Sequence, residues 1–270
     1  MSQSTVEALG RVAIVGAGPG DVDLLTLKAV KCIQAADVIF YDALVSEDIK
    51  ALFPTGVLCI YVGKRKGRHA IPQEGINQAL VDQAQLGLNV CRLKGGDPFI
   101  FGRGGEEALA LRDAGVPVEV VPGVSAANGC SAYAGIPLTH RGITQGCTFV
   151  TAHSRNSETG AEADSSINWP ALAASGNTLV FYMGLSRTER ISGQLQRGGL
   201  AGDTPVAIVE RGGTAQQRVM TGELASLTKL AQDNRAQAPA LIIVGQVVRL
   251  HHELSQVLQS AQSLPQQMSA

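Results

Sequence analysis

The stretch VAIVGAGPGDVDLLTLKA, residues 12–29, joins a short apolar run to a helical pattern through a glycine-rich turn. An apolar strand followed by a glycine turn and a helix is how a βαβ unit begins, so this stretch predicts an α/β fold with a parallel sheet. A dinucleotide-binding domain begins in the same way, and there the helix N-terminus receives a pyrophosphate. The turn therefore poses a choice between a nucleotide phosphate and another ligand.

The spacing of the glycines argues against a dinucleotide. The fingerprint of such a domain is G-x-G-x-x-G, whereas residues 16–20 read GAGPG. Pro19 biases Gly18 away from helical geometry, and Asp21 stands where the third glycine should be and would bring a carboxylate near a phosphate. Asp42 supports the opposite interpretation, because it ends the run VIFYD about 20 residues later, where a ribose-binding acid would stand. An NAD-type oxidoreductase therefore stays as an alternative.

Short apolar runs alternate with helical patterns along the whole chain, in two groups of about five strand candidates. We expect two α/β domains with mainly parallel, mixed sheets and a cleft between them. The expected organisation is an N-terminal domain over residues 11–123, a hinge and cleft segment over 124–142, a C-terminal domain over 143–252 and a polar tail over 253–270. The strand candidates are residues 12–15, 38–41, 59–62, 90–93, 118–121, 148–150, 178–182, 206–209 and 240–244, and helical patterns cover 24–35, 189–197 and 224–234.

Composition narrows the function classes. The 270 residues carry a net charge of −1, and 45% of them are hydrophobic. This balance predicts a globular protein without the overall positive field that favours nucleic acid or an anionic membrane surface. No run approaches the roughly 20 apolar residues of a membrane helix, so we expect a cytoplasmic protein. The five cysteines form no CxxC pair, and we expect neither disulfides nor a metal site.

A second stretch, RLKGGDPFIFGRGGEE over residues 92–107, describes the ligand better. Gly95 and Gly96 follow a strand and let backbone groups approach a ligand closely. Asp97 can accept hydrogen bonds from an amino group or from ribose hydroxyls. A neutral or cationic ligand therefore suits this stretch better than a pyrophosphate.

Several motifs taken together closely resemble the tetrapyrrole methylase family. They are VGAGPGDVDLLTLKA, YDALVS, VGKR, RLKGGDPFIFGRGGEE, VVPGVSAANGCSAYAGIPLTHR, VFYMG, PVAIVERGGT and PALIIVG, in one order from about residue 11 to 250. The resemblance implies a homodimer of two α/β domains around a cleft that holds S-adenosyl-methionine. It also implies methylation of uroporphyrinogen III at C2 and C7, which gives precorrin-2, the start of the routes to sirohaem, cobalamin and haem d1, together with S-adenosyl-homocysteine. At 270 residues the chain is expected to lack the additional N-terminal module of multifunctional relatives.

The resemblance also assigns site residues. Asp42 and Lys64 match the proposed proton acceptor and donor. The motif ERGGT has one residue more than is usual, which leaves Gly212 as an alternative to Gly213. The donor site implied by position comprises Pro19, Gly95, Gly96, Asp97, Ile100, Ser125, Ala126, Met183, Gly213 and Ala240.

Residue chemistry suggests what these groups do. Loss of a proton from the methylated macrocycle needs a base, which the resemblance assigns to Asp42, although Asp42 is equally well explained as a turn cap. The eight carboxylates of the substrate need local cations, for which we favour Lys64, Arg103 and Arg141, with Glu106 steadying Arg103. Arg103 is also a catalytic candidate, because it could instead take part in removing the proton. His140 is a candidate shuttle or a structural strut. Other methyltransferases of the fold, acting on a later precorrin, RNA or a protein, remain alternatives, as does a non-catalytic binding module.

Overall fold

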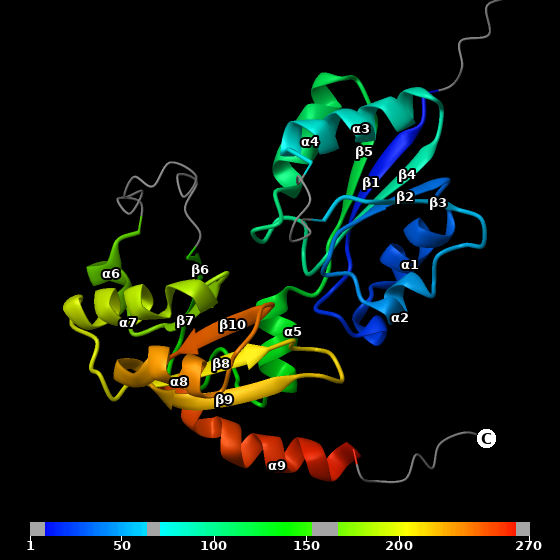
Figure 1. The fold of residues 1–270 in the computed structure, drawn as a ribbon. Helices are drawn as coiled ribbons and strands as arrows, with labels where there is room; N and C mark the ends of the chain where they lie inside the picture. Colours follow the sequence, from blue (N-terminus) through cyan, green and yellow to red (C-terminus); the bar gives the residue numbers. More distant parts are fainter. Residues whose placement is uncertain (1–8, 64–70, 153–166, 263–270) are drawn as a thin grey trace, which may run out of the picture. The chain divides into compact units, whose positions relative to one another are not determined.

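The computed structural model describes residues 9–63, 71–152 and 167–262, with side chains described as far as residue 258. The chain divides into two compact units, Met1–Ala126 and Ala127–Ala270. Each unit contains one five-stranded sheet with helices against it (Figure 1). The division lies inside the segment 124–142, while the domain boundaries expected from the sequence stay predictions.

The N-terminal unit is a parallel α/β sheet. Its strands follow the order β3-β2-β4-β1-β5, and each of the four neighbouring pairs is parallel. All strands therefore end at the same edge, where ligands bind in open α/β sheets. The elements in chain order are β1 (Arg11–Gly16), the 3-10 helix η1 (Val22–Leu24), α1 (Leu27–Gln34), β2 (Val38–Tyr41), α2 (Glu47–Lys50), β3 (Leu58–Tyr61), α3 (Gln73–Gln85), β4 (Asn89–Lys94), α4 (Gly104–Asp113) and β5 (Val118–Val121).

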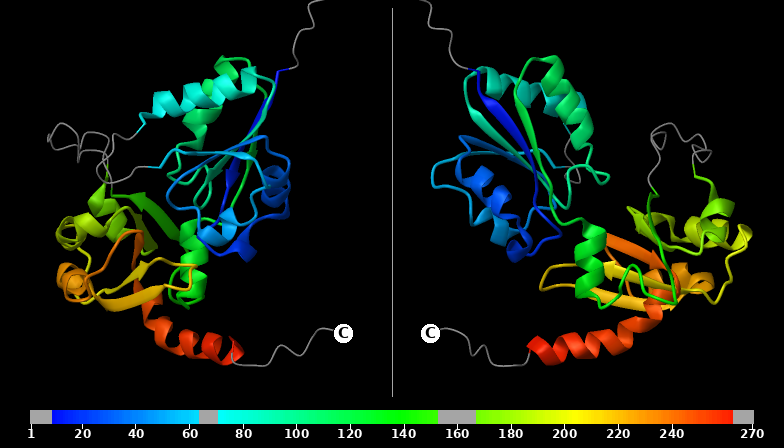
Figure 2. Two further views of the ribbon diagram at one scale, coloured as in Figure 1. Left: turned by 45° about the vertical axis from the view of Figure 1, so that its right-hand side comes forward. Right: turned by 180° about the vertical axis from the view of Figure 1, so that it is seen from behind.

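Helices cover both faces of this sheet because its strands are apolar on both sides. Ile14 and Phe40 pack with Leu80 of α3 on one face, and Ile39 and Leu93 lie in the core of the opposite face, which α1 and α2 cover. In Figure 2 the blue helices α1 and α2 lie on one side of the sheet, and the cyan and green helices α3 and α4 lie on the other. Strands buried on both faces read as continuous apolar runs, and this is why the sequence pattern identifies them.

The C-terminal unit has a mixed sheet of order β6-β7-β10-β8-β9. Only the pair β6 and β7 is parallel among its described strands, and the other three pairs are antiparallel. Helices α6, α7 and α8 contribute to the core on one face, around Phe181 and Ile208. The elements are α5 (Ala126–Tyr133), β6 (Cys147–Thr151), α6 (Trp169–Ala174), β7 (Thr178–Tyr182), η2 (Leu185–Arg187), α7 (Thr188–Arg197), β8 (Pro205–Glu210), β9 (Arg218–Glu223), η3 (Leu224–Ser226), α8 (Leu227–Asp233), β10 (Ala240–Val244), η4 (Gln246–Leu250) and α9 (His251–Gln262).

The α/β fold with mainly parallel sheets is confirmed, since five of the eight described strand pairs are parallel. The antiparallel pairs all lie in the C-terminal unit, where a hairpin joins β8 and β9 and needs no crossover helix. The sequence pattern does not predict strand β9. The small, polar tract of residues 154–166, for which the sequence predicts an exposed loop, lies outside the described residues.

The expected polar tail begins as a helix. Helix α9 runs from His251 to Gln262, and the His251 ring Nδ1 lies 2.5 Å from the carbonyl oxygen of Ala134 in the turn after α5. Gly135 in the same turn leaves room for α9, since a Cβ there would lie 3.0 Å from the backbone N of Ser255. The first part of the tail is therefore docked on its own unit. No helix in the described part of the chain is both long and apolar enough to cross a bilayer.

Candidate functional site

Three strand ends of the N-terminal sheet meet through glycine backbone. Gly18 donates its N–H to the carbonyl of Gly96 (3.1 Å), and Gly96 donates back to the carbonyl of Gly18 (2.7 Å). A Cβ on Gly16 would lie 2.5 Å from the backbone N of Gly123, and a Cβ on Gly123 would overlap the carbonyl oxygen of Gly96. Only glycine fits these positions, so the segments after β1, β4 and β5 are locked together. We call Gly16, Gly18, Gly96 and Gly123 the glycine junction.

The glycine junction leaves little for a pyrophosphate to bind. The N–H of Gly18 is already used by Gly96. The next helix is the short η1, and Asp21 caps it by accepting a hydrogen bond from the N–H of Asp23 (2.9 Å). A carboxylate at that place repels an anion, so the dinucleotide interpretation of the glycine turn loses its physical basis. Pro19 lies half-buried in this turn between two glycines with positive φ.

Asp97 connects the loop after β4 to the end of β5. One carboxylate oxygen accepts from the N–H of Phe99 (2.9 Å), and the other accepts from the N–H of Gly123 (3.1 Å). Ile100 donates its N–H to the carbonyl of Asp97 (3.3 Å). A carboxylate has about four lone-pair sites, so Asp97 keeps acceptor capacity for a ligand while these bonds hold it in place. Ser125, which is buried, follows shortly after β5.

Two further close contacts explain the glycines at positions 95 and 96. A Cβ on Gly95 would overlap Leu44 in the loop after β2. Gly96 has φ +69°, and a Cβ there would lie 3.6 Å from the backbone N of Ala126, the first residue of α5. The backbone of Gly95 and Gly96 is therefore packed closely against neighbouring segments at this edge of the sheet.

The loop between β4 and α4 is strained. Phe101 and Arg103 have φ of 53° and 61°, in the left-handed region that side chains other than glycine seldom adopt. Such conformations cost about 1–3 kcal/mol each and concentrate at functional sites. Phe99 and Phe101 are exposed by 59% and 40%, which is unusual for phenylalanine. The loop thus presents aromatic surface and one cation at the edge where the strands end.

Arg103 and Glu106 form a bidentate pair at the start of α4. Arg103 Nε lies 3.0 Å from Glu106 Oε1, and Nη2 lies 2.6 Å from Oε2. These hydrogen bonds raise the pKa of Arg103 above its usual value. A guanidinium has five N–H groups, so the remaining donors can reach a carboxylate of a ligand. Glu106 therefore holds the guanidinium of Arg103 in place in this structure.

Asp42 caps a turn in the structure. Its Oδ1 accepts from the N–H of Leu44 (2.9 Å), and its Oδ2 lies 4.0 Å from Nη1 of Arg92. The side chain keeps 24% of its surface exposed, so it can also meet a ligand. Its role as a proton acceptor stays a prediction. Lys64, its proposed partner, lies outside the described residues, as do Lys66 and Arg68.

Two predicted site residues of the C-terminal unit lie at one end of its sheet. Met183 follows β7, and Ala240 begins β10. Phe181 pairs with Ile242, and two residues further along the same register Met183 comes opposite Ala240. Met183 has φ 54° and is 50% exposed, so a strained backbone presents a thioether to the surroundings.

The same sheet end contains the motif ERGGT, and there the two adjacent glycines differ. A Cβ on Gly212 would lie 2.6 Å from the Cβ of Cys130 in α5, so Gly212 serves helix packing. Gly213 has φ 75°, and its N–H donates to Oε1 of Gln217 (2.9 Å). This difference favours Gly213 as the donor-site glycine, because Gly212 is already used in packing against α5.

Arg141 and His140 belong to an exposed turn of the C-terminal unit. His140 forms an isolated bridge with Thr144, and its ring Nδ1 lies 2.9 Å from the carbonyl oxygen of Arg141. This contact supports the structural explanation of His140. Arg141 is exposed and forms no ion pair with an acidic side chain in the described part of the chain.

The sequence analysis missed a buried charged cluster. Arg92 and Lys94 of β4 are each 4% exposed, and Glu107 of α4 is fully buried. Glu107 Oε1 accepts from Arg92 Nε (3.2 Å) and from Lys94 Nζ (3.0 Å). Burial, followed by the charge of Arg92, lowers the pKa of Lys94. In the sequence, this cluster is indicated by two cations, Arg92 and Lys94, that lie two residues apart in an otherwise apolar strand.

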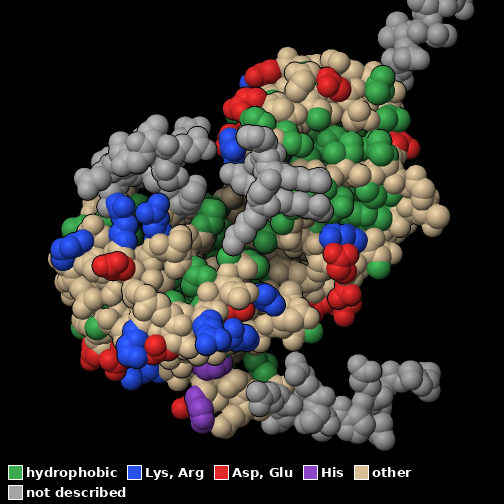
Figure 3. Space-filling view, in the orientation of Figure 1, with side chains coloured by type: hydrophobic (Ala, Val, Ile, Leu, Met, Phe, Trp, Pro, Cys, Tyr) green, Lys and Arg blue, Asp and Glu red, His purple; other side chains and the backbone are tan. Residues whose placement is uncertain are grey.

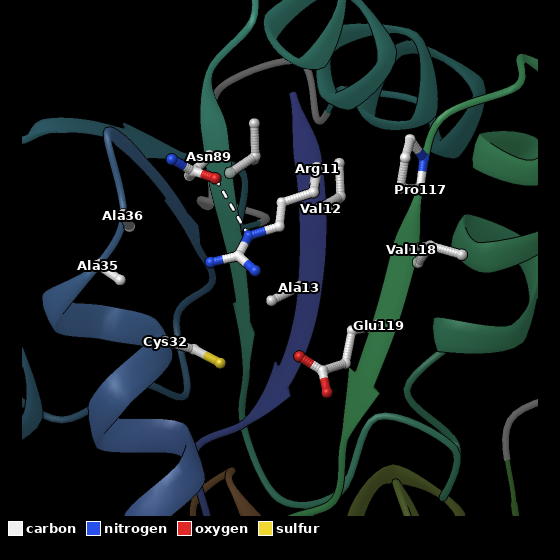
Figure 4. Close-up of a pocket in the computed structure, with 11 residues that line it drawn as sticks. Arg11, Val12, Ala13, Cys32, Ala35, Ala36, Asn89, Pro117, Val118 and Glu119 are labelled. Carbon is white, nitrogen blue, oxygen red and sulfur yellow. Dashed lines mark hydrogen bonds between the residues drawn. The ribbon is translucent and has the colours of Figure 1, made fainter. Parts of the chain in front are cut away.

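A cavity of the N-terminal unit lies at the opposite edge of its sheet. About 160 Å³ in volume, it is bordered by the starts of β1, β4 and β5 and by Cys32 of α1. Figure 4 shows Cys32 and Glu119 pointing into it, while the side chain of Arg11 extends from β1 toward β4 and donates a hydrogen bond to Asn89. Because ligands of open α/β sheets bind beyond the carboxyl ends of the strands, this cavity is separate from the candidate site.

Both units are α/β folds, and most of their predicted site residues lie at strand ends. Ligand-binding α/β enzymes bind their ligands at such ends. The family model of tetrapyrrole (corrin/porphyrin) methylases matches residues 11–228. The chain therefore belongs to the tetrapyrrole methylase family, and it is a methyltransferase. A sirohaem synthase of Edwardsiella ictaluri is 53% identical over 246 residues, and sirohaem synthase 2 of Serratia proteamaculans is 54% identical. These matches cover 91% of this chain but 51% of each relative, so the chain spans about half their length.

Solved structures agree with the family. Uroporphyrin-III C-methyltransferase from Thermus thermophilus is 39% identical, with a TM-score of 0.74 over 91% of this chain and 96% of its own. The same enzyme complexed with S-adenosyl-homocysteine is 40% identical, with a TM-score of 0.74 over 89% and 94%. A cobalt precorrin-4 methyltransferase is 28% identical, with a TM-score of 0.76 over 88% and 95%.

Proposed function

We propose that this chain transfers methyl groups from S-adenosyl-methionine to C2 and C7 of uroporphyrinogen III, giving precorrin-2 and S-adenosyl-homocysteine. The observation that carries the proposal is the glycine junction, which favours a ligand held by backbone shape over one held by phosphate contacts. The likeness to the Thermus thermophilus enzyme and to its complex with S-adenosyl-homocysteine supports the same substrate and donor.

The residues present fit S-adenosyl-methionine. Asp97, which follows Gly95 and Gly96 at the end of β4, has acceptor capacity for a ribose hydroxyl or an amino group. Small and apolar residues of both units complete the predicted set, with Met183 and Ala240 from the C-terminal unit. When bound, S-adenosyl-methionine supplies an electrophilic methyl group on a positively charged sulfur.

The residues of the chain then have to align and to move a proton. Transfer needs the pyrrole carbon about 3 Å from the methyl group and in line with the C–S bond, so the main task of the protein is orientation. We propose that Arg103 binds a carboxylate of the tetrapyrrole, that Arg141 and Lys64 bind others, and that Glu106 keeps Arg103 extended. Asp42 takes up the proton that the methylated ring loses, and Lys64 acts as the proton donor.

A later precorrin is a second candidate substrate, because the cobalt precorrin-4 methyltransferase has a similar TM-score. RNA is less suitable. Figure 3 shows Lys and Arg side chains mixed with Asp and Glu on the drawn face of the C-terminal unit, without a continuous basic stripe. We also propose a homodimer, which the family resemblance implies; light scattering after gel filtration tests it.

Anaerobic incubation with uroporphyrinogen III and labelled donor tests the proposal. We expect the tetrapyrrole to gain two methyl groups and the donor to become S-adenosyl-homocysteine. Methylation of a precorrin but not of uroporphyrinogen III would favour the second candidate. Reduction of NAD with no methyl transfer would contradict the proposed function altogether.

A further inference from the structure

The buried acid Glu107 holds together three elements of the N-terminal unit. Its Oε1 accepts three hydrogen bonds, from Arg92 and Lys94 of β4 and from Nε2 of Gln73 at the start of α3 (3.1 Å). Its Oε2 has no hydrogen-bond partner among the described residues, although Glu107 is fully buried. A carboxylate in this position is stabilised by its two cations, and it fixes the first turn of α4 against β4.

Glu107 lies one helical turn after Arg103. Its N–H donates to the carbonyl of Arg103 (3.2 Å), so Arg103 is attached directly to the anchored turn. The loop before Arg103 closes by a bond from Gly104 N–H to the carbonyl of Pro98 (3.0 Å). Arg103 is held in its left-handed conformation from both sides, which fixes where its side chain leaves the backbone, and Glu106 then holds the guanidinium.

The buried charged cluster of Arg92, Lys94 and Glu107 also lies next to Asp42, the proposed proton acceptor. Nη1 of Arg92 is 4.0 Å from Oδ2 of Asp42, while Nε of the same side chain binds Glu107. A buried ion cluster is seldom more stabilising than apolar side chains of similar volume, so stability alone does not account for one at the end of β4.

We propose that Glu107, neutralised by Arg92 and Lys94, is a positioning residue that orients Arg103 toward a carboxylate of the tetrapyrrole. The inference rests on the proposed function, because it takes the tetrapyrrole as the ligand of Arg103. Glu107 itself stays buried and acts through the first turn of α4 and not by touching the substrate.

A double-mutant cycle tests this coupling. The probe is uroporphyrin III, the oxidised tetrapyrrole that is not methylated, and its affinity is measured by fluorescence titration. We expect Arg103→Ala and Glu107→Gln each to weaken binding about tenfold, and the double variant to be within about twofold of Arg103→Ala, because residues that act as a unit are not additive. Affinity for S-adenosyl-homocysteine should stay within about twofold of wild type in Glu107→Gln.

Val81→Ala is the matched control, because Val81 lies buried in the core between α3 and the same face of the sheet. It should lower the melting temperature without changing uroporphyrin affinity. If Glu107→Gln does not fold, Lys94→Met replaces it in the cycle, with a smaller loss that is again non-additive with Arg103→Ala.

The outcomes separate the two claims. Additive losses from Glu107→Gln and Arg103→Ala, or an equal loss of S-adenosyl-homocysteine affinity, would overturn the positioning role alone. An Arg103→Ala variant that binds uroporphyrin III as well as wild type would overturn the proposed substrate role of Arg103, and the positioning role with it.

Discussion

The strand ends of the two sheets of this protein are held in place in different ways. In the N-terminal sheet, parallel strands end together, and the glycine junction and the buried Glu107 cluster hold their connecting loops. In the C-terminal sheet, antiparallel pairing brings the end of β7 next to the start of β10, and exposed Met183 follows directly from that register. The first end is fixed by backbone contacts and buried charge, and the second by strand register. Substitutions at the strand ends of the N-terminal sheet should therefore reduce stability and ligand binding more than substitutions at the end of the C-terminal sheet.

The largest effect is expected at Arg103. Arg103→Ala should lower kcat/KM for uroporphyrinogen III by about 100-fold, because a charged hydrogen bond to a substrate carboxylate is lost. Binding of S-adenosyl-homocysteine should be retained. Arg112→Ala at the other end of α4 is the control, because exposed Arg112 pairs only with neighbouring Asp113 among the described residues. Steady-state kinetics give the answer, and full turnover by Arg103→Ala would refute the assignment.

The glycine junction should come next. Gly123→Ala places a Cβ against the carbonyl oxygen of Gly96, and the backbone has to move. We expect a loss of about 1–3 kcal/mol in the free energy of unfolding, as overpacking typically costs, together with weaker S-adenosyl-homocysteine binding. Gly105→Ala in α4 meets nothing within 4 Å and should be neutral or slightly stabilising. Urea unfolding of both variants measures the contrast, and equal stabilities would mean that the junction tolerates a side chain.

A smaller effect separates the two glycines of the C-terminal unit. Gly213→Ala forces a side chain into a left-handed conformation, at a cost of about 1 kcal/mol, and should weaken S-adenosyl-homocysteine binding. Gly212→Ala should instead lower stability through its contact with Cys130 and leave affinity nearly unchanged. Calorimetric titration of each folded variant distinguishes them. Weaker binding by Gly212→Ala alone would reverse the assignment.

The smallest effect concerns one buried thiol in each unit. Burial raises the pKa of Cys91 and of Cys130 from 9.0 to about 12. Between these values the unfolded chain loses the proton while the folded chain keeps it, so stability falls as the pH rises from 9 toward 12. Each thiol contributes a slope of about 1 kcal/mol per pH unit in that window.

Cys91→Ala and Cys130→Ala should each make this alkaline loss less steep by a similar amount. Urea unfolding at several pH values between 8.5 and roughly 10.5 measures the slopes, which are compared in place of absolute stabilities because each substitution also removes packing. A slope unchanged in both variants would show that the thiols do not titrate in this way.

Sequence reasoning was most successful where the pattern was local. Apolar runs identified the strands of the parallel sheet, and residues 189–197 match α7 (Thr188–Arg197) closely. Strand β9 was missed because RVMTGE mixes polar residues and a glycine into an edge strand. Helix α9 was missed because its Gln- and Ser-rich composition resembles an unstructured tail, whereas His251 docks it on Ala134.

For the site, local pattern was sufficient for single residues and not for their contacts. The glycines at positions 95 and 96 predicted close backbone approach, but their contacts with Gly18 and Gly123 depend on how three strands are ordered in the sheet. Arg92, Lys94 and Glu107 look like surface charges in the sequence, and only the packing of α4 on β4 buries them. The two cations in an apolar strand mark β4 as unusual, but the contacts that they make depend on packing that the sequence pattern does not give.

The most direct test of the central claim is a crystal structure of this protein with S-adenosyl-homocysteine. We predict density for the nucleoside against Gly95, Gly96 and Asp97, with the Gly18 and Gly96 backbone bonds intact. An empty glycine junction in the presence of saturating S-adenosyl-homocysteine, or a nicotinamide coenzyme bound there with its pyrophosphate at η1, would contradict the account.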